Sequence, residues 1–318
     1  MRAYFLFPIF LTLISCSTSN NKAFINNVQK SSCNQENSYA YTKSDIPIPL
    51  QELKIDSSLF MYFNERDLNV ANAIGVIDVL SDYIQKKGRN RDAASPEQKI
   101  EWIQIRQELN DRIDLASLEI SAVTAELDCE EERLNQIASF LNEKEKRKES
   151  NLTVTSIILG AVSAIVTGVL VSKKDQSNTA DIMGVGVGIA DVTLGILLLT
   201  SSRKITLEHK RNVLRELWLG TETSTTYPPS IWYYLNYNPV PGRISLRERL
   251  ISNWKSFGQI RKTENNPDGD LDIYFGDGGK YTIDELENRA NMYDQIESQI
   301  KLMKQDLQNL KESIISVK

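Results

Sequence analysis

Side chains that commonly carry out acid–base or metal chemistry are scarce in this chain of 318 residues. His209 is the only histidine. A single imidazole excludes most histidine-based metal sites and most triads, which need a base held beside a nucleophile or several ligands at close spacing. Three cysteines are also too few for a disulfide-rich scaffold. We therefore expect no catalytic residues, no metal, no cofactor and no enzymatic activity.

Residues 266–272 begin like a calcium-binding loop but do not continue as one. An EF-hand loop needs glycine at its sixth position and glutamate at its twelfth, where this chain has Ile273 and Gly279. We instead expect a β-hairpin with strands at 271–275 and 280–283, joined by a glycine-rich turn. No Lys-Ser or Lys-Thr pair follows that turn, so it is not a phosphate-binding loop.

The first cysteine, Cys16, follows a short apolar stretch. Arg2 precedes about a dozen apolar residues, the length of a secretory signal and too short to cross a bilayer. The stretch ends in Leu13-Ile14-Ser15-Cys16, which resembles the lipobox of bacterial lipoproteins. An ordinary signal peptide or an uncleaved anchor is the alternative.

The lipobox resemblance implies cleavage of residues 1–15 and lipidation of Cys16 by diacylglyceryl and acyl chains such as palmitate. Several acyl chains give durable anchoring. The resemblance further implies a bacterial cell envelope location, and Ser17 after the cysteine favours the outer membrane, facing the periplasm. Residues 16–45 are polar without apolar periodicity and read as a flexible, lipid-anchored tether.

Two further cysteines, Cys33 and Cys129, remain after Cys16. An oxidising compartment permits a disulfide between them, which would fix the tether to the folded body. Two free thiols are the alternative, and the sequence leaves both open.

The overall charge bears on possible partners. The chain has 37 basic and 42 acidic residues and a formal net charge of −5 at pH 7. Nucleic-acid binding needs basic side chains to neutralise phosphates, so we expect no nucleic-acid partner. Membrane lipid, a second copy of the chain or another envelope protein are the expected partners.

A long helix is predicted over residues 97–149. No proline lies between 97 and 227, and Ser95, Pro96 and Gln98 form a capping-box pattern at its start. A heptad spacing follows, with nine of ten positions apolar and Glu130 the exception, and it favours coiled-coil packing. The ten positions are Leu109, Ile113, Ala116, Ile120, Val123, Leu127, Glu130, Leu134, Ile137 and Leu141.

Two apolar runs, 152–171 and 182–200, follow the long helix and are predicted to form a helical hairpin. The first run has twenty residues without a charge, enough to cross a bilayer as a transmembrane helix. Small residues recur every four positions on both runs, as in the glycine-zipper hairpins that this pattern resembles. These hairpin-packing residues are Ser156, Gly160, Ala164, Gly168, Gly184 and Gly188.

A single charge, Asp191, interrupts the second apolar run. It predicts a polar group facing a pore or a partner helix, since a charge in lipid is costly. Alternatively it faces a wet groove, or the segment does not insert fully. A further alternative makes the whole hairpin the apolar core of a soluble bundle.

The rest of the chain is predicted to pack around the long helix of residues 97–149. We expect helices at 68–87, 203–219 and around 246–256, and a last helix from 284, capped by Asp284. The last helix has its own heptad seam, for which the partner is the long helix, running antiparallel, or a second chain. That seam comprises Ile296, Ile300, Met303, Leu307, Leu310, Ile314 and Val317. Residues 221–283 read as a small aromatic module.

These elements predict a mainly α fold, an elongated coiled-coil bundle with a hydrophobic helical hairpin and a small α+β insertion. The expected divisions are 1–15, 16–45, 46–151, 152–200, 201–220, 221–283 and 284–318. The order of stalk, hairpin and returning stalk is similar in outline to α-helical pore-forming cytolysins. The first functional hypothesis is a non-enzymatic, membrane-anchored envelope scaffold; the alternative is a pore-forming or membrane-perturbing protein that oligomerises through the hairpin.

Overall fold

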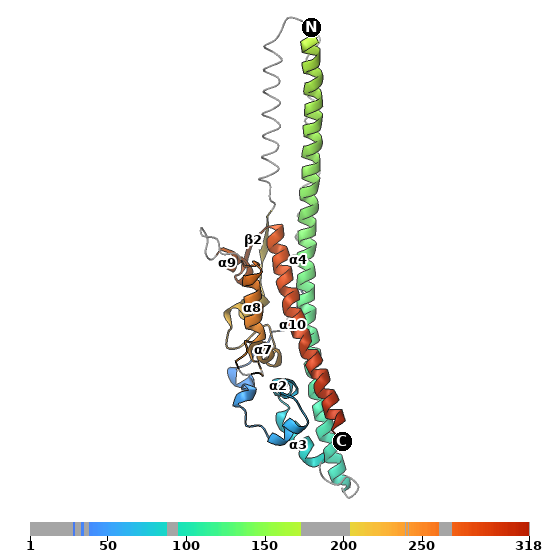
Figure 1. Ribbon diagram of the computed structural model, residues 1–318, viewed down its shortest axis with the longest axis vertical. Helices are drawn as coiled ribbons and strands as arrows, with labels where there is room; N and C mark the ends of the chain where they lie inside the picture. Colours follow the sequence, from blue (N-terminus) through green and yellow to red (C-terminus); the bar gives the residue numbers. More distant parts are fainter. Residues whose placement is uncertain are drawn as a thin grey trace. The chain divides into compact units, whose positions relative to one another are not determined.

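The computed structural model describes residues 28, 33–34, 38–87, 95–172, 204–238, 240, 242–260 and 269–317 (Figure 1). For residues 87, 152–172, 269 and 270 it describes the backbone alone. The expected signal peptide (residues 1–15), Cys16 and the second apolar run lie outside the described residues. The chain divides into two compact units, 1–133 with 208–279 and 288–318, and 134–207 with 280–287.

The described chain is mainly helical, with a small two-stranded sheet. The short 3₁₀ helices are η2 (Lys43–Asp45), η3 (Leu50–Glu52) and η4 (Ser57–Met61). The α-helices are α2 (Glu65–Ala73), α3 (Ile77–Lys87), α4 (Pro96–Ser172), α6 (Val213–Leu219), α7 (Pro229–Asn236), α8 (Leu246–Ser256), α9 (Gly269–Phe275) and α10 (Ile283–Ser316). The strands are β1 (Ile205–Glu208) and β2 (Gly278–Tyr281), which pair with each other.

Helix α4 starts where its capping box predicts and is longer than expected. The backbone N–H of Ser95 donates to Oε1 of Gln98 at 3.0 Å, and the N–H of Gln98 donates to Oγ of Ser95 at 3.4 Å. The helix then runs for 77 residues to Ser172. The first apolar run is therefore a continuation of the long helix, without a break between them.

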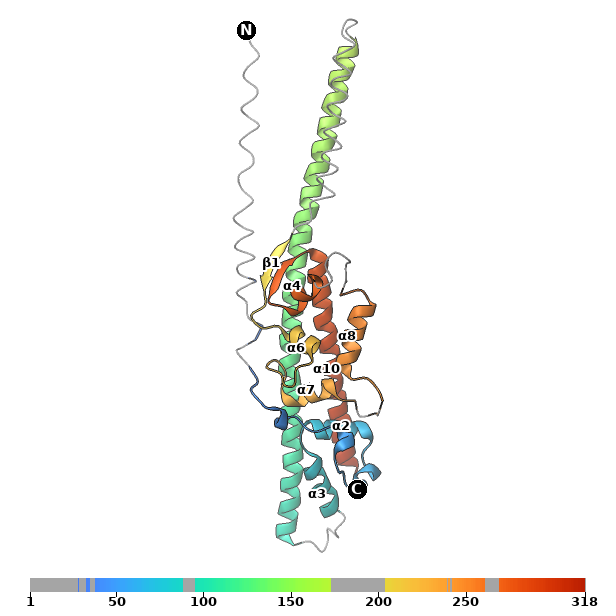
Figure 2. The ribbon, with the colours of Figure 1, turned by 90° about the vertical axis from the view of Figure 1, so that its left-hand side faces the viewer.

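The two heptad seams are buried within this one chain. On α4 every apolar seam position is buried, and only Glu130 is partly accessible. All seven seam residues of the last helix are buried as well. The Lys304 ammonium donates to Oγ of Ser121 at 2.7 Å, and Lys311 pairs with Asp114 at 3.3 Å. Rising numbers on α10 meet falling numbers on α4, so within the first unit the two helices run antiparallel, side by side (Figures 1 and 2).

The helix expected over 68–87 is instead two helices, α2 and α3. Gly75 separates them with a φ of +69°, a left-handed conformation that suits glycine and ends a helix. Asn64 caps α2 and forms a capping box with Asp67. A glycine in the middle of an otherwise periodic segment was the sequence signal for this break.

The single returning helix expected over 203–219 is also wrong, because this segment contains a strand and a shorter helix. Residues 205–208 form β1, with alternating buried and exposed side chains, and α6 begins only at Val213, capped by Asn212. The β-branched Ile205 and Thr206 suit a pleated strand. Gly220 ends α6 with a φ of +65°.

The β-hairpin expected over 271–283 is also wrong. Residues 269–275 form the helix α9, and β2 pairs with β1 rather than with a neighbouring strand. The last helix is capped by Thr282, whose N–H donates to Oε2 of Glu285 at 2.7 Å, and not by Asp284.

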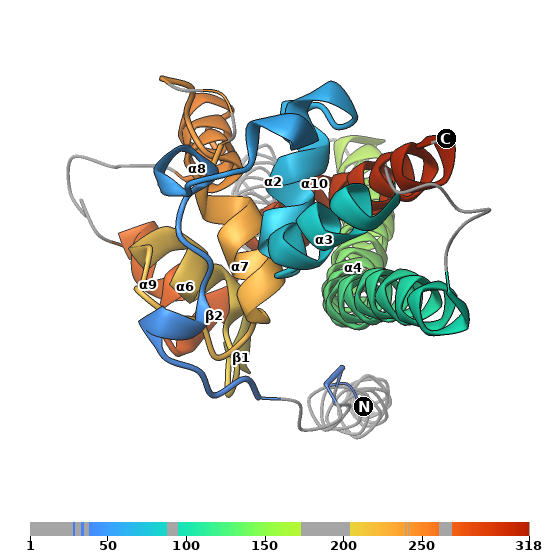
Figure 3. The ribbon, with the colours of Figure 1, turned by 90° about the horizontal axis from the view of Figure 1, so that it is seen from below.

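Residues 221–283 are more regular than the sequence suggested. Helix α7 packs against α2 and α8, and α6 packs against α9, as Figure 3 shows within the first unit. Most of the aromatic cluster is buried in this packing: Tyr227, Trp232, Tyr233 and Tyr234. Tyr237 differs, because 36% of it is exposed.

The expected flexible tether ends earlier than position 45. The backbone N–H of Tyr39 donates to the Thr225 carbonyl at 3.0 Å, and the Tyr41 hydroxyl donates to the Tyr227 carbonyl at 3.1 Å. From residue 38 onward the chain is therefore held against the folded body by hydrogen bonds.

Among the residues that the structure describes, no helix combines the length and the apolar character needed to cross a bilayer. The side chains of 152–172 and all of 173–203 lie outside the described part, so the hairpin stays a prediction.

Candidate functional site

A disulfide joins the N-terminal segment to the long helix. The sulfur atoms of Cys33 and Cys129 lie 2.05 Å apart, and their Cα atoms 5.5 Å apart. Beside them, the side-chain amide of Asn34 donates to Oε2 of Glu126 at 2.7 Å. Because Glu126 and Cys129 are three residues apart on α4, both attachments lie on one turn of that helix.

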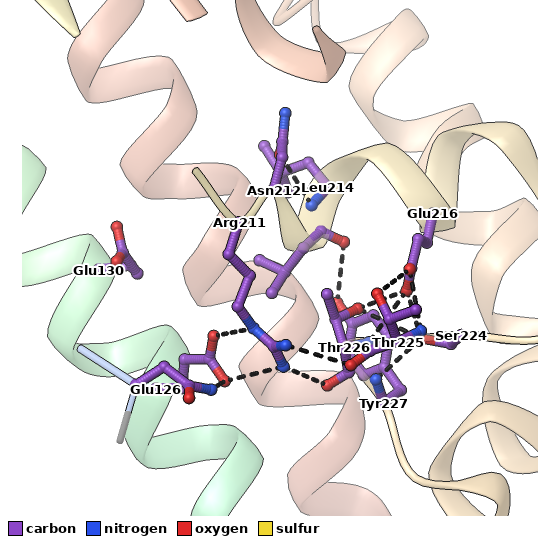
Figure 4. A network of polar contacts seen from close by, with 12 residues as sticks. Glu126, Glu130, Arg211, Asn212, Leu214, Glu216, Ser224, Thr225, Thr226 and Tyr227 are labelled. Carbon is purple, nitrogen blue, oxygen red and sulfur yellow. Dashed lines mark hydrogen bonds and ion pairs between the residues drawn. The ribbon is translucent and has the colours of Figure 1, made fainter. Parts of the chain in front are cut away.

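Glu126 also anchors Arg211, which lies just before α6 (Figure 4). The guanidinium donates from Nε to Oε1 of Glu126 at 2.7 Å. Its Nη1 and Nη2 donate to the carbonyls of Thr225 and Thr226, each at 3.1 Å. A charge-assisted, multiply bonded arginine of this kind fixes geometry, and here it ties α4 to the segment before α7.

The same segment wraps the carboxylate of Glu216, on α6 (Figure 4). The hydroxyls of Thr225 and Thr226 donate to it at 2.7 and 2.6 Å, and their backbone N–H groups at 2.9 and 3.2 Å; the Ser224 hydroxyl is a further donor. Burial alone would raise the pKa of Glu216, but these hydrogen bonds hold it below its usual value. Its oxygens are already engaged by protein donors, so the site positions a loop.

Arg289, on α10, is fully buried and stabilises the end of α9. One of its Nη atoms donates to the Tyr274 carbonyl, and the other to Oδ1 of Asn212 at 3.0 Å and to the Tyr293 hydroxyl at 2.8 Å. The amide of Asn212 donates to the carbonyls of Tyr274 and Gly276 at 2.9 and 2.8 Å. Together Asn212 and Arg289 satisfy carbonyls that the last turn of α9 would otherwise leave without donors.

Glu130 is the acidic counterpart of Arg289. Burial raises its pKa, while the charges of Arg133 and Arg289 act to lower it, and Arg133 forms an ion pair with it. A partly buried glutamate on the α4 seam thus lies within the electrostatic reach of a fully buried arginine on α10.

The single histidine lies close to these charges. His209 is only 8% exposed, and burial, together with the positive charges of Arg289, Arg133 and Arg215, lowers its pKa to about 2. Its imidazole therefore stays neutral near pH 7, far from the range in which a histidine transfers protons efficiently.

Three carboxylates, Asp128, Glu131 and Glu297, form an acidic cluster. Their oxygens lie within 4.8 Å of one another. The Lys301 ammonium forms an ion pair with Glu297, and the nearby acidic groups raise the pKa of Lys301. The Lys301 ammonium therefore already balances part of the negative charge that would attract a cation.

A cavity bordered by α2, α7, α8 and α10 has mainly positive groups among its charged side chains, unlike the acidic cluster. Its volume is 190 Å³. Arg66, Arg243 and Arg249 line it, together with Asp306 and the aromatic ring of Tyr237. Among the described residues, none of these three guanidinium groups forms a hydrogen bond or an ion pair.

At the inner side of this cavity, Tyr234 and Asp306 form a hydrogen bond. The Tyr234 hydroxyl donates to Oδ2 of Asp306 at 2.7 Å. Burial raises the pKa of Asp306, and the bond from Tyr234 and the charge of Arg66 oppose that rise. This arginine-lined pocket can therefore offer both positive charge and one carboxylate to a ligand.

The predicted site residues fall into two groups. Cys33 and Cys129 are bonded to each other. The small residues Ser156, Gly160, Ala164 and Gly168 lie on α4, but their side chains are outside the described part. Cys16, Gly184, Gly188 and Asp191 lie outside the described residues altogether.

Sequence reasoning missed Arg289 and the arginine-lined pocket for different reasons. The seam of the last helix extends backward by three and four residues from Ile296 to Tyr293 and Arg289. A charge at a seam position was thus a usable signal. The pocket had none, because its arginines come from chain segments far apart in sequence.

Comparisons with known proteins add no relative to this picture: no family model matches the chain, and no curated protein or solved structure does.

Proposed function

We propose that this chain is a non-enzymatic lipoprotein of a bacterial envelope, acting as a structural and interaction scaffold. Lipid on Cys16 holds one point of the chain to a membrane. A helical hairpin formed by 152–171 and 182–200 inserts into a membrane as a second attachment. The remaining helices, with their coiled-coil seams, form the body that contacts envelope partners.

The continuity of α4 is the observation that carries this proposal. One helix contains the buried seam from Leu109 onward and then the charge-free run 152–171. A segment without charges favours hydrocarbon because burial of its apolar surface is stabilising. A helix satisfies its own backbone hydrogen bonds, as a membrane segment must.

The disulfide is a second support. It fastens the chain to α4 seventeen residues after Cys16, and from residue 38 the chain is hydrogen-bonded to the body. Oxidised cysteines are common in exported proteins and rare in reducing compartments. An exported, lipid-bearing chain therefore agrees with the bond at Cys129.

Membrane fractionation with an alkaline carbonate wash tests the proposal. Four forms are compared: wild type, Cys16→Ala, a variant lacking 152–200, and the combination of both changes. Each single change should leave much of the protein in the pellet, because the other attachment remains, and the combination should release it to the supernatant. Metabolic labelling with palmitate should mark wild type but not Cys16→Ala.

Cys33→Ser is the matched control for Cys16→Ala, since it removes a cysteine without removing the lipid site. It should keep both the label and the membrane association. Gel mobility without reductant checks that the deletion variant still forms the Cys33–Cys129 bond. Retention of the combined variant in the washed pellet would contradict the proposal.

Dye release from liposomes separates the scaffold from a pore-forming protein. Tight binding to liposomes without release supports a scaffold. Rapid release that is lost in the variant lacking 152–200 would replace it with a membrane-perturbing function.

A further inference from the structure

We propose that the arginine-lined pocket, bordered by Arg66, Arg243, Arg249 and Asp306, binds the phosphate group of a phosphate monoester. This inference concerns the folded body alone and does not depend on how the chain is attached to a membrane.

Convergence of the three arginines is the first reason. Arg66 lies on α2, Arg243 lies just before α8, and Arg249 lies on α8. The fold thus brings arginines from distant parts of the chain, position 66 and positions 243 and 249, to one cavity. All three arginines are exposed, so water solvates them, and a cleft whose charged groups are mainly positive attracts an anion.

The contrast with Arg247 is the second reason. Arg247 lies on α8 two residues before Arg249, and its guanidinium donates from Nε to Oδ1 of Asn236 and from Nη1 to the Leu217 carbonyl, each at 2.9 Å. Arg211 and Arg289 are likewise multiply bonded. The arginines of the pocket form no such bond with any residue in the described ranges, so their donors are available to a ligand.

The charge balance selects a dianion. Three guanidinium groups and one ionised Asp306 leave two positive charges in the lining. A phosphate monoester carries close to two negative charges at neutral pH, whereas a carboxylate carries one. Guanidinium groups also match the oxygen geometry of phosphate through paired hydrogen bonds.

The rest of the lining suits the organic part of such an ester. Leu246 and Leu302 supply apolar surface and Tyr237 an exposed ring, while Asp306 can accept hydrogen bonds from ligand hydroxyls. A second hollow of 460 Å³ shares Arg66 and Val240 with the pocket and leaves room for a longer substituent. Glu65 also lines that hollow, so the excess of positive charge is concentrated in the pocket itself.

Isothermal titration calorimetry of the full chain in detergent micelles, at constant ionic strength, tests this site. The probes are inorganic phosphate, glycerol 3-phosphate and dihexanoyl phosphatidic acid below its micelle concentration. We expect saturable binding of at least one ester. Equal affinity for glycerol 3-phosphate and for dihexanoyl phosphatidic acid indicates that the ligand is a soluble ester. Tighter binding of dihexanoyl phosphatidic acid indicates that the ligand is a lipid headgroup.

Variants then assign the binding to the pocket. Arg66→Gln, Arg243→Gln and Arg249→Gln should each weaken binding about ten-fold or more, since each removes charge-assisted hydrogen bonds. Asp306→Asn should strengthen phosphate binding, because it removes a negative charge that repels the anion. Arg112→Gln, an exposed arginine on α4 away from this pocket, is the matched control and should change affinity less than two-fold.

Circular dichroism checks that each variant is folded. If Arg66→Gln does not fold, Arg66→Lys replaces it, because lysine keeps the positive charge and removes the guanidinium group. Two results overturn the proposal. One is the absence of saturable binding of all three probes to wild type. The other is an equal loss of affinity in Arg112→Gln and in the pocket variants, which would indicate a general charge effect.

Discussion

Two regions of the first unit use arginine in opposite ways. Around α6 and α9, Arg211 and Arg289 are surrounded by carbonyls, hydroxyls and a carboxylate, each at hydrogen-bonding distance. In the pocket between α2 and α8, Arg66 and Arg249 face a cavity with no such partners among the described residues. The same side chain thus holds the fold together in one place and is left available in the other.

This difference separates charges that hold the fold together from charges that are available to a ligand. A buried charge must be matched by its own protein, because an unmatched one is strongly destabilising. An exposed charge can remain without a protein partner because water solvates it. We therefore expect substitutions of the hydrogen-bonded arginines around α6 and α9 to lower the free energy of unfolding. We expect substitutions of the pocket arginines to weaken ligand binding instead.

The largest expected effect is that of Arg289→Met. Removing a fully buried guanidinium takes one hydrogen-bond donor from each of Asn212 Oδ1, the Tyr293 hydroxyl and the Tyr274 carbonyl. It also leaves Arg133 as the remaining of the two arginines that lower the pKa of Glu130. We expect a loss of about 3 kcal/mol in the free energy of unfolding, measured by urea unfolding of the full chain in detergent with tryptophan fluorescence. Arg249→Met is the matched change in the pocket. Equal losses in the two variants would erase the contrast between the regions.

The next effect is that of Glu216→Ala. The change removes the acceptor for the hydroxyls and N–H groups of Thr225 and Thr226 and for the Ser224 hydroxyl. Because water can reach part of this site, we expect a loss of about 2 kcal/mol in the same unfolding experiment. Glu222→Ala, a change to an exposed glutamate two residues before Ser224, should alter stability by less than about 0.5 kcal/mol. A small loss for Glu216→Ala would mean that solvent replaces the carboxylate.

A smaller effect is expected from pH. Folding lowers the pKa of His209 from about 6.5 to about 2, so below pH 6.5 the unfolded chain binds a proton that the folded chain does not. The free energy of unfolding therefore falls as the pH is lowered, by about 1.4 kcal/mol at pH 5.5 from this group alone.

His209→Gln should remove that part of the slope between pH 7.5 and 5.5. The raised pKa of Glu130 acts in the opposite direction, but it is present in both proteins, so their difference isolates the imidazole. Urea unfolding at several pH values provides the measurement. Parallel curves for the two proteins would show that the imidazole is protonated in the folded state.

The smallest expected effect on stability belongs to the pocket itself. Arg66→Gln and Arg243→Gln should change the free energy of unfolding by less than about 0.5 kcal/mol without ligand, because the exposed guanidinium groups form no hydrogen bond or ion pair with a described residue. Adding glycerol 3-phosphate should raise the unfolding midpoint of wild type more than that of either variant. A ligand-independent loss as large as that of Arg289→Met would make these arginines structural.

Local patterns predicted much of the helical frame. The start of α4 at Pro96 follows from its capping residues, and α8 lies where a short helix was expected. The apolar positions of both seams are buried, as their spacing indicated. Glu130, the one charged position on the first seam, lies within electrostatic reach of Arg289 on α10.

Contacts between distant segments explain what the sequence did not show. Residues 205–208 fit a helical stripe as well as a strand, and pairing with β2, some seventy residues later, decides for the strand. Residues 271–275 alternate like a strand, but Asn212 and Arg289 satisfy the carbonyls at the end of a helix there. The pocket depends on the packing of α2 against α7 and of α7 against α8, which no local pattern encodes.

The bond between Cys33 and Cys129 also has a mechanical consequence. A pulling force on the chain before Cys33 passes through the sulfurs directly into the middle of α4, and bypasses residues 34–128. The hydrogen bonds of Tyr39 and Tyr41, the capping of α2 and the break at Gly75 are thereby shielded from the load. After reduction of that one bond, the tension would act first on the hydrogen bond from Asn34 to Glu126 and then on those of Tyr39 and Tyr41.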